Sequence, residues 1–474
     1  MNSQTVNRQS FWVKPYVQLG NSTSTSEREI VWFSTFGKKH WTFEYRLLAA
    51  KSTLDKTAAE KSEEAESPWI RASVDKVDCF ADPKGSAVKQ LVAQLPHVSL
   101  NDKLEYRLRL DADEVFRTQC TYSNRVVVVG DWADGYCGAA QIAASIMPLD
   151  PGMVVIPGDV VYDNGRTSDY PEVFFPVLNA DQTSSQTGAP LLRSRLFVAA
   201  VGNHDISRPD TLTESLSEGE KNDLFGFLRF WRQPKNNAIK MPRREVKKML
   251  GKGKTVSLLW QRFGAEFIEK LNFSFDVVDD TYTCHWIVLD ANKYMDWSRE
   301  ELRTWLRADL QAAKNALWRF VVFHQPPFNS DVKYRLEQRM RLICDILQEE
   351  MTDLGLHGHC HFYQRHDPIV FKAHTSHVSE DGTVAGDIFT DTTFDGVQNK
   401  NPSGVIYLVT GAGGKLSDKR PSSFGISSAT RKLVDDRFSF TVMDFSDDGK
   451  QLTVRQMSQG PEGLEELDRF VIEK

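Results

Sequence analysis

The hydrophobic and polar positions divide the chain into two parts, and the first part has the pattern of short strands. In residues 43–47, for example, Phe, Tyr and Leu alternate with Glu and Arg. Alternation with a period of two is typical of strands that bury one face. The predicted strands cover residues 12–19, 29–35, 41–49, 69–77, 87–95, 104–110 and 115–121. This density of short strands predicts an all-β sandwich of the fibronectin-III or immunoglobulin type over residues 1–122.

From Arg125 onward the pattern changes to continuous apolar runs. Residues 126–129 are all valine, and similar runs lie at 153–156, 196–201, 286–289, 320–323 and 405–409. A continuous apolar run is expected of a strand that is covered on both faces. Helical periodicity lies between the runs, notably at 298–314 and 332–349. Residues 123–474 are therefore predicted to form an α/β domain with layered β-sheets flanked by helices.

Polar residues that can bind metal ions follow five predicted strands, namely four of these runs and a further strand at 354–356. They stand in the motifs Gly130-Asp131, Gly158-Asp159, Gly202-Asn203-His204-Asp205, His324 and His357-Gly358-His359-Cys360-His361. In layered α/β folds, ligands bind beyond the ends of the strands. Each motif alone has a structural explanation, since Gly-Asp occurs in turns and a strand-end Asn-His-Asp can cap a helix. Together, carboxylate, amide and imidazole groups without a cysteine cluster indicate a site for Fe, Mn or Zn.

The motifs, taken in this order, resemble the signature of the calcineurin-like metallophosphoesterases. Tyr162, in the sequence Gly-Asp-Val-Val-Tyr, narrows the resemblance to the purple acid phosphatases. Many other members of the superfamily carry a histidine at the position of Ala133, and the purple acid phosphatases replace that ligand by the tyrosine. Residues 324–330 (HQPPFNS) and 359–365 (HCHFYQR) look like two further motifs of this family.

The resemblance implies two metal ions that share the bridging ligand Asp159. The first, expected to be Fe(III), would be bound by Asp131, Asp159, Tyr162 and His361. The second, expected to be Zn(II), Mn(II) or Fe(II), would be bound by Asp159, Asn203, His324 and His359. Phenolate and carboxylate are hard ligands that suit a trivalent ion, whereas Asn and His suit a divalent one.

The same resemblance implies hydrolysis of phosphate esters by a metal-activated hydroxide, as in an acid phosphatase-like phosphomonoesterase. Asp159 and His204 would be the catalytic residues. His204 is not a ligand and would stabilise the transition state or protonate the leaving oxygen. Plant-type members have a second histidine ten residues after the metal-binding one, but Tyr334 stands there in this chain.

Two other functions stay open at this point. One is a phosphodiesterase of the same superfamily that acts on cyclic nucleotides, nucleotides or other diesters. The other is a binding protein without catalytic activity, in which the metal domain is vestigial. The complete set of candidate ligands counts against the second, because a vestigial site is expected to lose one or more of them.

An insertion of about 65 residues, at about 206–272, lies outside the resemblance. Within residues 229–270 there are 12 Lys and Arg against 3 Glu, a local charge of +9 in a chain of net charge −6. Its densest part is 240–248, and an amphipathic stretch at 259–271 predicts that the insertion is partly helical. The basic residues form either a solvated helix face or a lid that attracts polyanionic substrates.

Two further features are predicted to be structural. Cys360 lies between two candidate ligands and is expected to point away from the metals. The glycine-rich residues 411–414 are expected to form a tight loop near the site. Because they lack the Gly-Lys-Ser/Thr ending of a P-loop, they do not predict nucleotide binding.

Composition places the protein among ordinary globular proteins. The 474 residues are 41% hydrophobic and 26% charged, and no apolar run approaches the length of a membrane-spanning helix. The first 20 residues have no apolar core of a signal peptide, and the six cysteines are scattered. We therefore expect a cytoplasmic protein, unless a leader was removed beforehand, which would make it secreted or periplasmic. The expected partner is a phosphorylated small molecule or polyanion, with no nucleic acid or membrane, and the oligomeric state is open.

Overall fold

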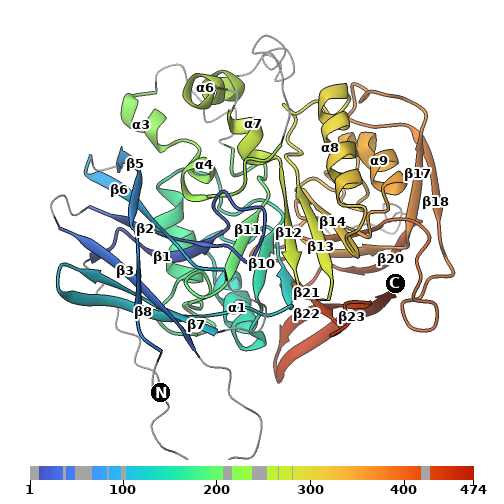
Figure 1. Ribbon diagram of the computed structural model, residues 1–474. Helices are drawn as coiled ribbons and strands as arrows, with labels where there is room; N and C mark the ends of the chain where they lie inside the picture. Colours follow the sequence, from blue (N-terminus) through green and yellow to red (C-terminus); the bar gives the residue numbers. More distant parts are fainter. Residues whose placement is uncertain are drawn as a thin grey trace, which may run out of the picture.

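The computed structural model describes residues 10–35, 39–48, 67–82, 85–97, 103–206, 216–237, 254–264, 266–279, 281–417 and 428–474. Two large β-sheets form the centre of the molecule, and helices cover their outer faces (Figure 1). The densest basic part of the insertion, predicted at 240–248, lies outside the described residues. Within the described residues, no helix is long and apolar enough to cross a membrane.

The first sheet has ten strands, with a parallel centre that is extended on both sides by strands that pair in antiparallel fashion, except that β1 joins the centre in parallel. Its centre consists of β9 (Val126–Val128), β10 (Met153–Ile156) and β11 (Leu196–Ala199). The C-terminal strands β21 (Ser439–Phe445), β22 (Gln451–Gly460) and β23 (Gly463–Glu473) extend it beyond β9. The N-terminal strands β1 (Val13–Gln18), β2 (Glu29–Ser34), β6 (Ala87–Gln94) and β5 (Asp75–Ala81) extend it beyond β11.

The second sheet has seven strands, of which four central ones are parallel. In spatial order they are β12 (Phe273–Val278), β13 (Thr283–Val288), β14 (Trp318–Val322), β15 (Leu354–His357), β19 (Ile406–Thr410), β16 (Tyr363–His366) and β20 (Thr430–Val434). A separate hairpin joins β17 (Ile369–Ala373) and β18 (Gly386–Thr390). The predicted apolar strands of the second part are all present.

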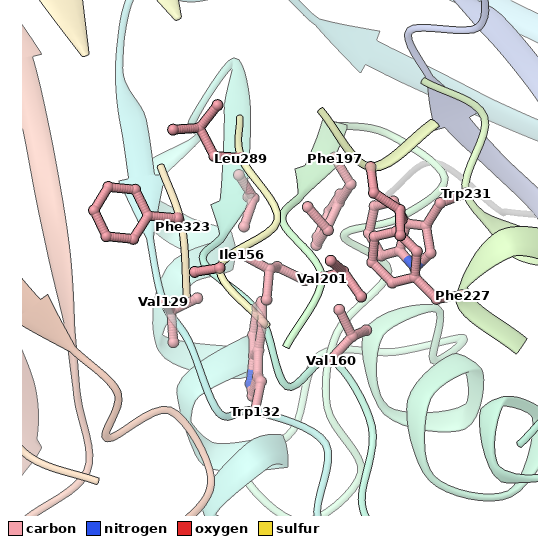
Figure 2. Packing of buried hydrophobic residues seen from close by; sticks show 14 of the residues in the cluster. Val129, Trp132, Ile156, Val160, Phe197, Val201, Phe227, Trp231, Leu289 and Phe323 are labelled. Atoms are coloured by element: carbon pink, nitrogen blue, oxygen red, sulfur yellow. The ribbon is translucent and has the colours of Figure 1, made fainter. Parts of the chain in front are cut away.

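The apolar runs are continuous because both faces of these strands are buried. Val126 and Val128 belong to the core between the two sheets, where Trp286 of the second sheet also lies. Val127 packs instead in the cluster with helix α1 (Cys137–Ile146). On the second sheet, alternate residues face α8 (Glu300–Ala312) and α9 (Cys344–Glu349). The hydrophobic cluster that contains Val127 continues around the strand ends, where residues of both sheets meet (Figure 2).

The described part of the first 122 residues forms two packed layers, but one layer belongs to the ten-stranded sheet. The smaller layer contains β4 (Ile70–Ala72), β3 (Trp41–Leu48), β7 (Lys103–Leu110) and β8 (Asp113–Thr121). The layers meet in a common core, with the rings of Trp32 and Trp41 centred 5.8 Å apart. Strand β1 pairs in parallel with β11 at Val17 and Leu196. The β-sandwich therefore shares a sheet with the following part, and its fibronectin-III or immunoglobulin type and the boundary at 122 stay predictions.

One predicted strand is divided between the two layers. The prediction at 69–77 becomes β4, which pairs with β3, and β5, which pairs with β6. The chain crosses between the layers at residues 73–74, which belong to neither strand. Alternation alone predicts a strand but does not identify the sheet to which it pairs.

The helices follow the predictions in part. The prediction at 298–314 is confirmed by α8, but 332–349 contains only a 3₁₀ helix (Arg339–Ile343) followed by α9. Residues 332–338 are not helical, because the Asp331 side chain accepts backbone hydrogen bonds from Lys333 and Tyr334 and holds a turn instead.

The described residues of the insertion are partly helical. Its helices are α3 (Glu218–Asp223), α4 (Gly226–Phe230), α6 (Lys254–Phe263) and α7 (Glu266–Leu271). The amphipathic stretch is thus confirmed as two helices, and its apolar residues Leu259, Phe267 and Leu271 are buried. The remaining short helices are a 3₁₀ turn (Met147–Leu149), a π-turn (Tyr170–Phe174) and α2 (Phe175–Leu178).

Candidate metal centre

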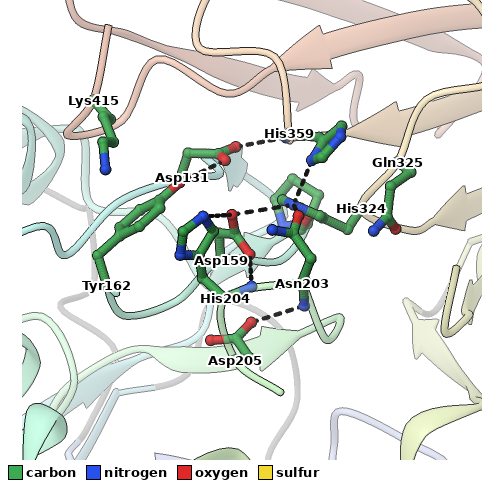
Figure 3. Close-up of polar contacts among 12 residues, drawn as sticks. Asp131, Asp159, Tyr162, Asn203, His204, Asp205, His324, Gln325, His359 and Lys415 are labelled. Atoms are coloured by element: carbon green, nitrogen blue, oxygen red, sulfur yellow. Dashed lines mark hydrogen bonds and ion pairs between the residues drawn. The ribbon is translucent and has the colours of Figure 1, made fainter. Parts of the chain in front are cut away.

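The predicted site residues gather where the parallel strands of the two sheets end (Figure 3). Asp131 follows β9, Asp159 and Tyr162 follow β10, and Asn203 follows β11. The second sheet contributes His324 after β14, and His359 and His361 after β15. Parallel strands place their carboxyl ends at the same edge, so each apolar run delivers its polar residue to one place.

A first group of ligand atoms forms around Asp131. The Tyr162 hydroxyl donates to Asp131 Oδ1 over 2.8 Å, and Tyr162 Oη lies 3.2 Å from His361 Nε2. His361 Nε2 is itself 3.5 Å from Asp131 Oδ1. A phenol oxygen, a carboxylate oxygen and an imidazole nitrogen therefore face one another. We call Asp131, Tyr162 and His361 the first donor group.

A second group of ligand atoms forms around His324. Its Nε2 lies 3.0 Å from Asn203 Oδ1 and 3.2 Å from His359 Nδ1. His324 Nδ1 donates to the Pro157 carbonyl over 3.0 Å, which orients the ring so that Nε2 faces the other ligand atoms. We call Asn203, His324 and His359 the second donor group.

Asp159 lies between the two donor groups. Its Oδ2 is 3.3 Å from His324 Nε2. Ligand atoms of Asp131, Asp159 and His324 all lie within 4.8 Å of one another, and all three residues are buried. This is the position that a carboxylate shared by two metal ions requires.

Three of the candidate ligands have a strained backbone. Asp131, Asp159 and His359 have φ angles of 56°, 49° and 71°, in the left-handed region that side chains other than glycine rarely adopt. Neighbouring glycines permit the close packing of these turns. A Cβ at Gly202 would lie 2.2 Å from Asp159 Oδ1, and a Cβ at Gly358 would lie 2.5 Å from Asp131 Oδ2. Strain of this kind is characteristic of functional sites.

The buried charges of the site depend on one another. Burial alone would raise the pKa of Asp159, but the charges of His324 and His204 hold it well below its usual value. Burial alone would lower the pKa of His324, but Asp159 and Asp131 raise it to about 9. Burial and the same two carboxylates raise the pKa of Tyr162. A phenolate at Tyr162 therefore requires an additional positive charge beside it.

His204 faces the site without belonging to either donor group. Its backbone N–H donates to Asp159 Oδ1 over 2.8 Å, and its ring lies 4.5 Å from that of Tyr162. The ring Nδ1 donates to the Asp163 carbonyl over 2.7 Å, since a carbonyl oxygen can only accept. This bond directs Nε2 toward Asp159, whose Oδ2 is 4.0 Å away.

The structure adds three residues that the sequence analysis did not assign to the site. Asp205 is fully buried, and its carboxylate accepts from the backbone N–H groups of Gly202 and Val160, which joins two ligand-bearing turns. Its place in the Asn-His-Asp motif was the available signal. Glu337 Oε2 lies 3.4 Å from His359 Nε2, and Lys415 Nζ lies 4.1 Å from the centre of the Tyr162 ring. No sequence pattern distinguished these two.

The features predicted to be structural lie as expected. Cys360 is buried in a small apolar cluster with Phe362 and Val409, away from the donor groups. The loop 411–414 packs against the turn of Asp131, whose carbonyl accepts from the Gly414 N–H over 2.9 Å. The ring of Tyr334 lies 3.9 Å from that of His359, and its hydroxyl accepts from Lys333 Nζ over 2.7 Å.

Comparison with known proteins shows what this fold is similar to. The chain is similar in structure to the purple acid phosphatase PPD1 from seeds of yellow lupin (Lupinus luteus), with a TM-score of 0.58, 15% identity and coverage of 97% of this chain and 74% of that one. GAP50, the anchor in the inner membrane complex of Plasmodium, matches at a TM-score of 0.41 and 14% identity, over 74% of this chain and 89% of that one. None of the curated protein sequences matches the chain.

The similarity to the purple acid phosphatase concerns the fold, and a match to a family model identifies the family of the chain. The model described as calcineurin-like phosphoesterase matches residues 124–363, about half of the chain. That range contains every residue of both donor groups together with Asp159 and His204. The chain therefore belongs to the calcineurin-like phosphoesterase family.

Proposed function

We propose that this protein is a phosphoesterase with two metal ions that hydrolyses phosphate monoesters. The observation that carries the proposal is the pair of donor groups on either side of Asp159. The first offers Asp131 Oδ1, Tyr162 Oη and His361 Nε2 within 2.8–3.5 Å of one another. The second offers Asn203 Oδ1 and His359 Nδ1 at 3.0 and 3.2 Å from His324 Nε2.

The chemistry of the residues fits two different metal ions. Asp131, Asp159, Tyr162 and His361 would hold Fe(III), because carboxylate and phenolate oxygens are hard, charged ligands. Asp159, Asn203, His324 and His359 would hold Zn(II), Mn(II) or Fe(II). Burial lowers the pKa of His359, which favours the neutral imidazole that a metal ligand needs, whereas at His324 a metal ion would have to displace the proton that Asp159 and Asp131 stabilise. Bound metal ions supply an activated water and polarise phosphate oxygens.

His204 would act on the substrate rather than on the metals. His204 Nε2 faces Asp159, while Nδ1 is held by the Asp163 carbonyl. When the ring is protonated on both nitrogens, Nε2 is therefore the atom that would donate a hydrogen bond to a phosphate oxygen or a proton to the leaving oxygen. The Asp159 carboxylate is positioned by the His204 N–H. Lys415, which forms an ion pair with Asp163 at 3.6 Å, adds positive charge beside Tyr162.

A phosphodiesterase is the second candidate function, and the observation that favours it concerns Tyr334. At the place where plant-type purple acid phosphatases are expected to have a histidine, the Tyr334 hydroxyl accepts a hydrogen bond from Lys333. Burial raises the pKa of Tyr334, so it is a weaker acid than a histidine. A diester with a better leaving group depends less on protonation than an alkyl monoester does. The expected substrate is in either case a phosphorylated small molecule or another polyanion.

A panel of substrates tests the proposal. The full-length protein, purified without added metal and after reconstitution, is assayed with aryl and alkyl monoesters, bis-aryl diesters and cyclic nucleotides. Elemental analysis and a visible spectrum are recorded on the same sample. Higher kcat/KM for monoesters, with about two metals per chain, supports the proposal. Preference for diesters supports the second candidate, and two bound metals without turnover of any ester indicates the binding protein.

A further inference from the structure

A cavity of about 270 Å³ lies apart from the metal centre, between the N-terminal strands and the insertion. Strands β5 and β6 form one wall, and the chain after α4 together with α7 forms the other. Six polar residues matter here: Asp78, Gln90, Arg229, Arg232, Lys235 and Lys270. Four of the six are cations, and one is an anion. The four cations belong to the segment 229–270, whose basic composition stands out in the sequence.

The cations of this cavity are held in place by the fold. Arg232 Nε donates to Glu29 over 2.6 Å, and the Glu29 side chain is only 3% exposed. The Arg229 guanidinium lies 3.8 Å from the centre of the Phe80 ring. Two arginines are therefore oriented before any ligand arrives, which lowers the entropic cost of binding.

The two lysines are less well compensated. Lys235 faces Glu266 at 3.7 Å, but the Glu266 side chain is 65% exposed, so the pair is screened by water. Lys270 forms no ion pair within the described part of the chain and lies 5.6 Å from the centre of the Phe263 ring. Burial, and next the charge of Lys235, lower the pKa of Lys270. The cations repel one another across the cavity, and a bound anion would relieve that repulsion.

We propose that this cavity, which we call the basic pocket, binds a small anion that carries two or more phosphate groups. Because Arg232 already donates through Nε and Nη2 to Glu29, its remaining N–H groups, Arg229 and the two lysines would meet the ligand, and their charges suit an anion of high charge. The volume is that of a compact anion rather than of a large cofactor. Since the basic pocket joins the N-terminal strands to the insertion, such a ligand stabilises their contact. The proposal is independent of the function assigned to the metal centre.

Methylenediphosphonate, which phosphatases do not hydrolyse, is the probe for a calorimetric titration of the full-length protein. Two variants separate the sites: Asp159→Asn in the metal centre and Lys235→Gln with Lys270→Gln in the basic pocket. We expect Asp159→Asn to keep one binding site per chain. We expect the double glutamine variant to lose at least about tenfold in affinity for that site, with the loss shrinking as salt increases.

Three controls keep the test decisive. Lys372→Gln, on β17 and outside the basic pocket, should bind as the parent does. Lys235→Arg with Lys270→Arg keeps the charge and should retain affinity. The melting temperature, measured with and without the probe, shows whether each variant folds, and the probe should raise it only where the basic pocket is intact. Unchanged affinity in the folded glutamine variant, or complete loss of binding in Asp159→Asn, overturns the proposal.

Discussion

Glu337 and His324 lie on opposite sides of the His359 ring. Glu337 Oε2 is 3.4 Å from His359 Nε2, whereas His359 Nδ1 faces His324 at 3.2 Å. Lys293 and Arg339 contact the Glu337 carboxylate at 3.5 and 3.7 Å and keep it there. When Nδ1 binds a metal, the proton of the neutral ring stands on Nε2, the atom that lies 3.4 Å from this carboxylate. Glu337 is thus placed to set both the tautomer and the orientation of His359.

Glu337→Gln should weaken the second metal site. An amide cannot support the Nε2 proton as a carboxylate does, and such partners typically contribute 10–100-fold to metal affinity. Titration against a competing chelator measures the affinity for Zn(II) directly. Glu349→Gln, which alters an exposed ion pair with Arg307, is the matched control and should leave the affinity unchanged. Equal affinities in both variants would show that Glu337 does not position His359.

Asp159→Ala should remove both metals, because Asp159 lies between the donor groups. Elemental analysis of the purified variant should fall from about two metals per chain to a small fraction of one. Asp387→Ala removes an exposed carboxylate that pairs with His374 and should leave the metal content intact. Full metal content in Asp159→Ala would exclude a bridging role.

Tyr162→Phe should remove visible colour from the iron-loaded protein. A tyrosinate bound to Fe(III) absorbs in the visible region, and Tyr162 Oη belongs to the first donor group. His204→Ala is the control, because its ring touches that of Tyr162 without offering a ligand to this group. If native protein contains no iron and is colourless, the assignment to the purple type is wrong, while the chain's place in the calcineurin-like phosphoesterase family is unaffected.

His204→Ala should separate metal binding from turnover. Its Nε2 faces the site, but it is not a member of a donor group. We expect near-normal metal content and a loss of roughly 10²–10⁴-fold in kcat, the usual contribution of a positioned acid or base. The control measurement is the metal content of the same preparation, since a parallel loss of metal would identify His204 as a ligand.

His285 should make stability depend on pH above neutrality. It lies between Asp276 and Asp309, at 2.7 and 2.9 Å. Burial alone would lower the pKa of His285, but the two carboxylates raise it from 6.5 to about 9. Since the folded pKa is the higher one, the stabilisation is complete below about pH 6.5 and is lost as pH rises through about 9. A shift of this size corresponds to at most roughly 3 kcal/mol.

Chemical denaturation at pH 6 and pH 10 measures this effect. The difference in the free energy of unfolding between the parent and His285→Gln should shrink from pH 6 to pH 10. His374→Gln is the control, because His374 pairs with Asp387 at 2.9 Å but is 57% exposed. Its effect should be small at both pH values. A constant difference for His285→Gln would show that its charge does not stabilise the fold.

Many residues of the metal centre can be predicted from short segments of the sequence. Asp131 and Asp159 each follow a strand whose two faces are buried, and a buried strand must be a continuous apolar run. The turn after such a strand needs a glycine, because another segment of backbone lies so close that a Cβ atom would collide with it, as a Cβ at Gly202 would with Asp159. These are requirements of short segments, so they appear as motifs that can be recognised one at a time. The same holds for the alternation that predicts the N-terminal strands.

The relationships between distant segments were decided only by the tertiary structure. Val17 pairs with Leu196, Glu337 faces His359, and Lys235 and Lys270 line the same basic pocket. No local sequence pattern distinguishes the turn that contains Glu337 from other turns. Hydrophobic patterns state which face of a strand or helix is buried, but not what buries it. The sequence by itself therefore determined the strands, their polar ends and the family resemblance. Which strands share a sheet, what orients His359 and where the basic residues gather depend on long-range packing, which local patterns do not encode.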